Sequence, residues 1–252
     1  MTRLHSLYLL GGVTLAALVA TLFSAPIPQD PAYHLFTDES APLGIPNFAN
    51  VASNAPFLVV AVLGFHGLSR EPLTGTHPAL KTLYRVFFVG VFLTAFGSGW
   101  YHLNPNNETL VWDRLPMTIS FMALFSVIIG EHISAMLARR CFPFLLLAGL
   151  LSVGYWHLTE TAGNGDLRPY ALVQFLPMLL IPIILVLFPA ALKPVSYYWG
   201  VILFYVLSKG VEILDSEIYA VTGFLSGHSL KHVLAAVATF TFYLALRRRT
   251  MI

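Results

Sequence analysis

Residues 169–191 read PYALVQFLPMLLIPIILVLFPAA, an apolar stretch that contains no charged side chain. A helix rises 1.5 Å per residue, so about 20 mostly apolar residues suffice to cross the hydrocarbon core of a bilayer. This stretch is therefore predicted to be a transmembrane α-helix.

Seven further windows of the chain have a similar length and apolar character, and turn-forming proline and glycine residues separate them. Together they predict an all-α, polytopic membrane helical bundle. The eight predicted spans are 6–25, 48–68, 83–103, 113–137, 142–159, 169–191, 195–215 and 226–246.

The overall composition excludes a soluble domain. Of the 252 residues, 57% are apolar and 10% are charged, whereas a soluble domain carries about 25% charged residues. A formal net charge of +2 gives no indication of a nucleic-acid partner. The single cysteine, Cys141, excludes an internal disulfide framework.

The charges at the ends of the spans predict the orientation in the membrane. Basic residues gather at every second boundary: Arg3; Arg70, Lys81 and Arg85; Arg139 and Arg140; Lys193; and Arg247, Arg248 and Arg249. The boundaries between them carry acidic residues: Asp30, Asp38 and Glu39; Glu108; Glu160 and Asp166; and Glu217. Because Lys and Arg favour the cytoplasmic side, eight spans with both termini in the cytoplasm are predicted.

The first span has two interpretations. Arg3, the apolar run and the small residues Ser24 and Ala25 are typical of a cleaved signal peptide. However, Pro26 would directly follow the cleavage point, and the apolar run is long. We therefore predict a retained signal-anchor helix over residues 1–28, followed by a membrane domain over 29–252.

Five polar residues are predicted to lie at similar depth near the extracytoplasmic ends of three spans. Ser98 and His102 are four residues apart, and so are His228 and His232, so each pair shares one helix face. Asp113 opens the next predicted span after a short loop. Independent placement would scatter these residues over both sides of the membrane.

This set of residues suits a metal-dependent hydrolytic site. Three imidazoles are a common ligand set for catalytic Zn²⁺, which leaves a fourth position for water, and bound zinc lowers the pKa of that water to about 7. Asp113 has the chemistry to take and return a proton. The Ser98 hydroxyl can orient the water or stabilise an oxyanion.

Each residue also has a structural interpretation. A single histidine at a helix end is commonly an interfacial or hydrogen-bonded residue, and an HxxxH pair arises by chance. Ser98 lies between Gly97 and Gly99 and could serve close helix packing. Asp113 could be the N-cap of its helix. The coincidence of all five at one depth favours the metal site.

A second polar cluster lies in the span 195–215. Lys209, Glu212 and Asp215 are spaced three apart and are predicted to share one helix face. Ionisable residues inside a membrane are functional candidates. We favour a charge-neutralising Lys209–Glu212 pair, and expect Asp215 to line a substrate cavity.

At these positions the chain resembles the alkaline ceramidases, within a superfamily that includes adiponectin-receptor-like proteins and the Per1 family. The run GSGWYH at 97–102, Asp113 and the run HSLKH at 228–232 match the shared pattern of that superfamily. The segment NFANVASN at 47–54 resembles the start of the first core helix of ceramidases. The resemblance covers residues 38–246.

The resemblance implies a seven-helix core, to which the first span is an addition. It also implies Zn²⁺ bound by His102, His228 and His232, with Asp113 and Ser98 as catalytic residues. Trp100 and Tyr101, in the same run, are further candidates for lining the cavity. The implied substrate is a membrane lipid, and the implied reaction is hydrolysis of its N-acyl amide bond to a fatty acid and a free amine.

The chain also departs from the family. Ceramidases bind calcium through an acidic loop that ends in a glutamate, and Asn47 occupies the matching position here, which argues against calcium dependence. The compact, loop-poor layout suggests a bacterial inner-membrane protein. Because most bacteria make little ceramide, another acyl amide or an acyl ester remains an alternative substrate.

Two functions of other classes remain open at this stage. One is a lipid receptor or sensor with a structural metal, as the adiponectin-receptor relatives suggest. The other is a bis-histidine haem protein, in which imidazoles face each other across the bundle. Haem binding has no use for Asp113 or Ser98.

Overall fold

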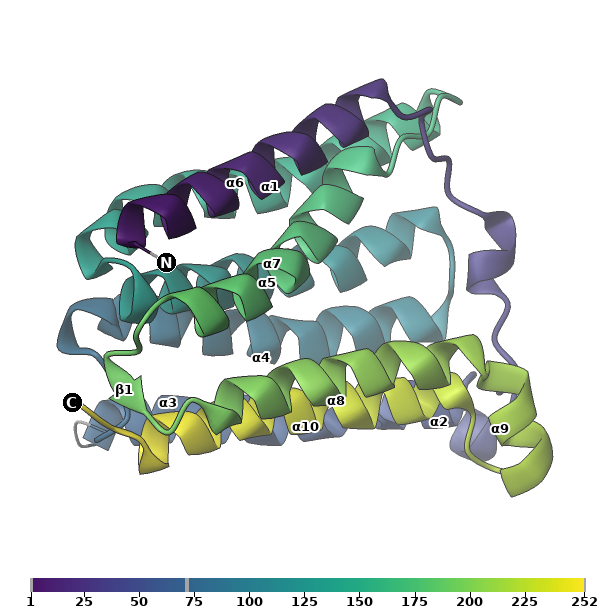
Figure 1. Cartoon of the computed structure of the whole chain (residues 1–252). Coiled ribbons are helices and arrows are strands. Elements are labelled where there is room, and N and C mark those ends of the chain that lie inside the picture. The colour runs from purple at the N-terminus through teal and green to yellow at the C-terminus, as the bar shows by residue number, and fades with distance from the viewer. Residues whose placement is uncertain (1, 71–72, 252) are drawn as a thin grey trace.

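The computed structural model describes residues 2–70 and 73–251, and it is an all-α bundle (Figure 1). The α-helices are α1 Arg3–Phe23, α2 Phe48–Ala52, α3 Ala55–Arg70, α4 Lys81–Leu103, α5 Asn107–His132, α6 Ala135–Thr161, α7 Arg168–Leu187, α8 Ser196–Ile213, α9 Asp215–Thr222 and α10 Gly227–Arg248. Short 3-10 helices cover Pro31–His34, Pro42–Gly44 and Pro78–Leu80, and two-residue strands β1 Leu192–Lys193 and β2 Thr250–Met251 pair antiparallel.

Within the described residues, seven helical segments are long and apolar enough to cross a membrane. They include α1, α4, α5, α6, α7 and α10, and a span over Phe48–Arg70 that combines α2 and α3. The predicted polytopic membrane bundle is thereby confirmed, and the protein is an integral, multi-pass membrane protein.

Helix α8 corresponds to the remaining predicted span but is not among these seven segments. Its 18 residues include Lys209 and Glu212, which lower its mean hydropathy. The helix nevertheless packs along α10 as part of the bundle (Figure 1). It ends at Ile213, so Asp215 does not belong to it and instead begins the short helix α9.

Helix α5 starts earlier than predicted, and this corrects the interpretation of Asp113. The side chain of Asn106 caps the helix by accepting hydrogen bonds from the backbone N–H groups of Glu108 and Thr109, at 2.9 and 3.0 Å. Asp113 therefore lies inside the helix and is not its N-cap. The predicted span began at 113 because the first turns of α5 are polar and a search for apolar windows leaves them out.

The boundary between α5 and α6 also differs from the prediction. Helix α5 ends at His132 and α6 begins at Ala135, capped by Ser134, so 133–137 belongs to the turn and the next helix. Charged residues in the first turns of α6, Arg139 and Arg140, are exposed. Long basic side chains can extend from a helix end to water. A helix can therefore begin with charged residues, and α6 begins before the apolar run at 142.

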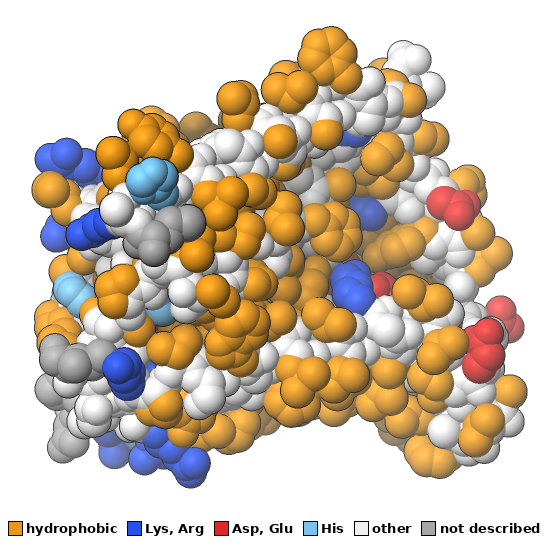
Figure 2. All heavy atoms as spheres, in the orientation of Figure 1, with side chains coloured by type: hydrophobic (Ala, Val, Ile, Leu, Met, Phe, Trp, Pro, Cys, Tyr) orange, Lys and Arg blue, Asp and Glu red, His pale blue; other side chains and the backbone are white. Residues whose placement is uncertain are grey.

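The two ends of the bundle differ in charge. The chain starts and finishes at the same end (Figure 1). On the face drawn in Figure 2, Lys and Arg side chains gather at that end, and Asp and Glu side chains lie toward the opposite end. We refer to these as the basic and the acidic end. The alternation of charge along the sequence thus corresponds to separation in space.

The main hydrophobic core lies in the half of the bundle nearer the basic end. Its fully buried side chains include Phe88 of α4, Ile128 of α5 and Phe242 of α10. At the basic end itself, the guanidinium of Arg249 turns inward and forms a buried ion pair with Glu131, with N–O distances of 2.6 and 2.9 Å.

The same carboxylate of Glu131 accepts hydrogen bonds from two tyrosines. The Tyr84 hydroxyl donates at 2.6 Å and the Tyr198 hydroxyl at 2.8 Å. Every carboxylate oxygen of Glu131 is therefore paired, which a buried charge requires. This network attaches the C-terminal segment to α4, α5 and α8.

Helix α1 packs against α7, and one arginine connects their neighbouring ends. Arg168, the first residue of α7, donates a hydrogen bond of 2.5 Å to the carbonyl of Ser24, just beyond α1. Arg168 also pairs with Asp166 at 2.8 Å. Hydrogen bonding from Arg168 lowers the pKa of the Asp166 carboxyl from 3.8 to about 2.

Candidate metal centre and membrane cavity

Three histidines from two helices meet in the half of the bundle nearer the acidic end. His102 lies in the last turn of α4, and His228 and His232 lie in the first two turns of α10. All three side chains are buried, with 1% to 5% of their surface exposed. The structure therefore brings together the three predicted ligands.

The spacing of the three rings suits coordination of one ion. Each histidine offers one ring nitrogen such that the three nitrogens lie within 4.8 Å of one another. The Nε2 atoms of His102 and His232 are 3.3 Å apart, and two nitrogens bound at 2.0–2.1 Å to one tetrahedral ion lie about 3.3 Å apart. The triad could thus hold a metal ion with little movement.

The donor chemistry also fits a metal ion. Imidazole nitrogens are common zinc ligands, and Nε2 of His102 faces Nε2 of His232. The ring centroids lie 4.8–4.9 Å apart in edge-to-face contacts. This packing leaves no space for a haem plane between any two rings, so the structure does not favour the bis-histidine haem interpretation.

The segment that joins α2 to α3 fixes the position of α10. The Ser53 hydroxyl lies 2.8 Å from Nδ1 of His232 and donates a hydrogen bond to the Asn50 carbonyl. If the Ser53 hydroxyl accepts a hydrogen bond from Nδ1–H, Nε2 of His232 keeps a free lone pair for a metal. The side chain of Asn50 also accepts hydrogen bonds from Ser226 and Ser229 at the start of α10.

A lysine and a glutamate lie beside His228. The Lys231 ammonium is 2.9 Å from Nε2 of His228 and 3.0 Å from the carboxylate of Glu212. A metal bound through this nitrogen would replace the lysine contact, and Lys231 would remain paired with Glu212. Lys209 also pairs with Glu212, at 2.7 Å, as predicted.

Asp215 supports the start of α10 and does not line the cavity. Its carboxylate accepts hydrogen bonds from the backbone N–H of His228, at 2.6 Å, and of Thr37, at 3.1 Å. A Cβ on Gly227 would lie 2.8 Å from the Cα of Asp215, so the glycine permits this approach. Asp215 thereby ties α9, α10 and the N-terminal linker together.

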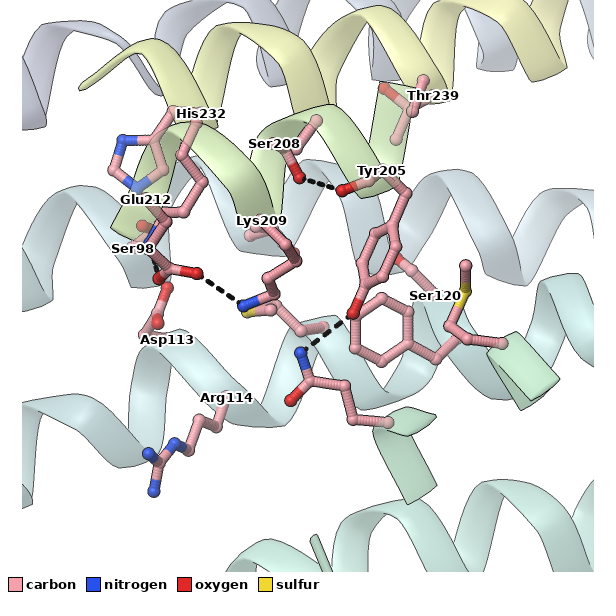
Figure 3. Close-up of a pocket in the computed structure, with 18 of the residues that line it drawn as sticks. Ser98, Asp113, Arg114, Ser120, Tyr205, Ser208, Lys209, Glu212, His232 and Thr239 are labelled. Carbon is pink, nitrogen blue, oxygen red and sulfur yellow. Dashed lines mark hydrogen bonds and ion pairs between the residues drawn. The ribbon is translucent and has the colours of Figure 1, made fainter. Parts of the chain in front are cut away.

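Ser98 and Asp113 face each other across the α4–α5 interface. Both side chains line the cavity together with His232 (Figure 3). A Cβ on Gly97 would lie 2.0 Å from the Trp112 carbonyl oxygen. Gly97 therefore allows the close packing that brings Ser98 to Asp113, so the predicted packing role belongs to the neighbouring glycine.

The linker between α1 and α2 covers the triad on the side of the acidic end. The ring of Phe36 packs on His102 and His228, with centroid distances of 4.7 and 4.4 Å. His34 anchors the linker through hydrogen bonds to Tyr101, at 2.9 Å, and Asn107, at 2.8 Å. Access from this direction is therefore blocked.

The acidic residues of the linker serve its own backbone. Asp38 is fully buried, and its carboxylate accepts hydrogen bonds from Ser40 and, at 3.0 Å, from the backbone N–H of Ala49. The amide of Asn47 donates to the His102 carbonyl at 2.8 Å. Asn47 thus holds the end of α4.

A cavity of about 480 Å³ reaches His232 of the triad and extends between α4, α5, α7, α8 and α10. Its polar wall includes Ser98, Asp113, Lys209, Glu212, Lys231 and His232. Farther from the histidine, its wall is formed mainly by apolar residues such as Phe87, Val91, Phe121, Leu124 and Met178. A hydrogen bond of 3.1 Å between Gln174 and Tyr205 crosses it (Figure 3).

The cavity matches a hollow on one side of the bundle. Figure 2 shows basic and acidic side chains inside this hollow, within a face that is otherwise largely hydrophobic. A volume in the range of about 300–1,000 Å³ with few polar groups is typical of small-molecule sites. The cavity thus offers room for an apolar chain beside the triad.

The other predicted cavity-lining residues have different places. Lys209 and Glu212 line the cavity, as predicted. Trp100 is 58% exposed on the outside of α4, and Tyr101 is buried against the linker. Neither belongs to the cavity wall.

Comparisons of the chain with protein-family models, with curated proteins and with solved structures find no match. The functional argument therefore rests on the geometry of the site.

Proposed function

We propose that this protein is a zinc-dependent intramembrane hydrolase that cleaves the N-acyl amide bond of a ceramide-like lipid. The observation that supports this proposal is the buried triad of His102, His228 and His232 beside Ser98 and Asp113, at one end of a largely apolar cavity. Three imidazoles are a known ligand set for catalytic zinc.

The residues around the triad have complementary tasks in amide hydrolysis. His102, His228 and His232 would hold the zinc ion, which would supply Lewis acidity toward the carbonyl and the water. Asp113 accepts the proton as a water oxygen adds to the acyl carbon, and then returns it to the nitrogen as the C–N bond breaks. Ser98, which lines the same cavity, orients the water beside Asp113. The products are a fatty acid and a free amine.

The shape of the site supports a lipid substrate. Phe36 covers the triad, whereas the cavity opens on the side of the bundle. An acyl chain can then enter from the bilayer and lie along the apolar wall while its amide reaches His232. The resemblance to alkaline ceramidases supports an amide over an ester, and either bond would fit this geometry.

We further propose a bacterial inner-membrane location with the basic end, and so both termini, in the cytoplasm. The separation of basic from acidic residues supports this orientation. The triad, near the acidic end, would then lie close to the periplasmic face. Residues 1–28 would act as a retained anchor, in keeping with the packing of α1 on α7.

The proposal is tested by incubating the purified protein with matched acyl-amide and acyl-ester lipids and measuring released fatty acid. We expect release from the amides, at a rate reduced at least about 100-fold in Asp113→Asn. Glu217→Gln, an exposed carboxylate on α9, is the matched control. If no lipid is hydrolysed by the zinc-loaded protein, the hydrolase proposal fails and a receptor or sensor with a structural metal takes its place.

A further inference from the structure

Arg114 is a buried cation on the cavity wall to which the proposed reaction assigns no task. It follows Asp113 on α5 and is 5% exposed. In Figure 3 its guanidinium extends away from the Asp113 carboxylate. Across residues 2–70 and 73–251, Arg114 forms no ion pair with any carboxylate.

The surroundings of Arg114 fix the guanidinium without neutralising it. One terminal nitrogen, NH2, donates a hydrogen bond of 2.7 Å to the side-chain oxygen of Gln29. The guanidinium carbon lies 4.3 Å from the ring of Trp156, 4.8 Å from that of Tyr170 and 5.6 Å from that of Tyr33. The other terminal nitrogen, NH1, is buried and has no hydrogen-bond partner.

An unpaired, buried guanidinium is suited to bind an anionic ligand. A buried charge is unfavourable unless it is paired, and intramembrane charges that persist commonly serve a ligand. The aromatic rings contribute cation–π attraction, but they cannot accept a hydrogen bond at NH1 in its own plane. A guanidinium presents its donors as a rigid fork that matches the oxygens of a carboxylate or a phosphate.

The other charges on the cavity wall favour the same kind of ligand. Arg114, Lys209 and Lys231 outnumber the two carboxylates, Asp113 and Glu212. Both lysines share the single carboxylate of Glu212. The wall therefore carries an excess of positive charge, which attracts an anionic group and disfavours a cationic one.

We infer that the lipid bound in this cavity carries an anionic group, a carboxylate or a phosphate, and that Arg114 binds it. This inference rests on the proposed function, because it places the anionic group on the amine side of the scissile amide. Asp113 and Arg114 line the same cavity, so a lipid with its amide beside Asp113 can extend its anionic group toward the guanidinium. The acyl chain would then occupy the apolar part of the cavity.

The test compares lipids that differ only in that group. N-Palmitoylglycine carries a carboxylate where N-palmitoylethanolamine carries a hydroxymethyl group, and N-palmitoyl-phosphoethanolamine carries a phosphate. Dissociation constants are measured for the purified full-length protein in neutral detergent by native mass spectrometry, which distinguishes bound intact lipid from its hydrolysis products by mass. We expect at least one anionic lipid to bind about tenfold or more tightly than the neutral lipid.

Variants of Arg114 test whether this side chain causes the preference for anionic lipids. Arg114→Gln should abolish the difference between the lipids, and Arg114→Lys should retain part of it. Arg140→Gln, at an exposed arginine on α6 near the basic end, should leave all affinities unchanged. Which anionic lipid binds more tightly in the wild-type protein distinguishes a carboxylate from a phosphate.

The outcomes separate this inference from the proposed function. Equal affinities for neutral and anionic lipids in the wild-type protein, or a preference that persists in Arg114→Gln, would overturn the inference even if amides are hydrolysed. An anion preference that depends on Arg114 without any hydrolysis would support the binding site and reject the hydrolase. The wild-type comparison needs no variant, so it stands even if Arg114→Gln fails to fold.

Discussion

The Nε2 atoms of His102 and His232 lie 3.3 Å apart, although 130 positions of the chain separate the two residues. Helices α4 and α10 supply these atoms, and α2 with its C-cap residue holds the start of α10 in place through Asn50 and Ser53. A spacing that matches two ligands of one tetrahedral ion is thus maintained by contacts outside the triad.

Ser53 provides the first prediction. Its hydroxyl is positioned to fix the tautomer of His232, and removing such an outer partner lowers metal affinity by about 10–100-fold. Ser53→Ala should show this loss in a competition titration with a zinc chelator while its melting temperature stays close to that of the wild type. Ser216→Ala, at an exposed serine of α9, is the control, and equal zinc affinity in Ser53→Ala and Ser216→Ala would reject the role of Ser53.

The fold was largely predictable because every helix that crosses the bilayer needs a long apolar segment. Long apolar windows in the sequence therefore identified the membrane helices. The boundaries were less predictable because tertiary contacts decide them. Asn106 caps α5 seven residues before Asp113. Arg249, which belongs to the basic cluster at the last predicted boundary, is buried and pairs with Glu131.

The candidate site was predictable where residue spacing carries the information. The Ser98–His102 and His228–His232 pairs follow from helical periodicity. Phe36 and Ser53 could not be found in this way, because their contacts depend on how the linker and α2 fold back onto α10. Arg114 carried one unused signal, namely a charge inside a predicted span.

The buried ion pair at the basic end leads to a stability prediction. Arg249→Ala leaves the Glu131 carboxylate buried without its cation, which is expected to lower the free energy of unfolding by about 3–5 kcal/mol. Arg248→Ala, at the exposed neighbour, should change it by less than about 0.5 kcal/mol. Equilibrium unfolding in mixed micelles measures both, and similar values for the two variants would contradict the buried pairing.

The Asp166–Arg168 pair predicts a dependence of stability on pH. The folded-state pKa of Asp166 is lowered to about 2 from 3.8, so the carboxylate stabilises the folded state above pH 3.8. This contribution declines as the pH falls toward 2 and the group becomes protonated. Asp166→Asn should therefore melt at a lower temperature than the wild type at pH 7, and the difference should narrow below about pH 4. A difference that is constant from pH 7 to pH 3 would exclude this origin.

The most direct measurement is the metal content of the protein purified without added metal or chelator, determined by plasma mass spectrometry. Because three buried imidazoles surround a single position, we predict close to one zinc per wild-type chain. We predict a loss of that zinc in His228→Ala and its retention in His66→Ala, at an exposed histidine of α3. A wild-type protein with no metal above the buffer blank even after incubation with zinc, or a His228→Ala variant that retains the full amount, would contradict the metal centre.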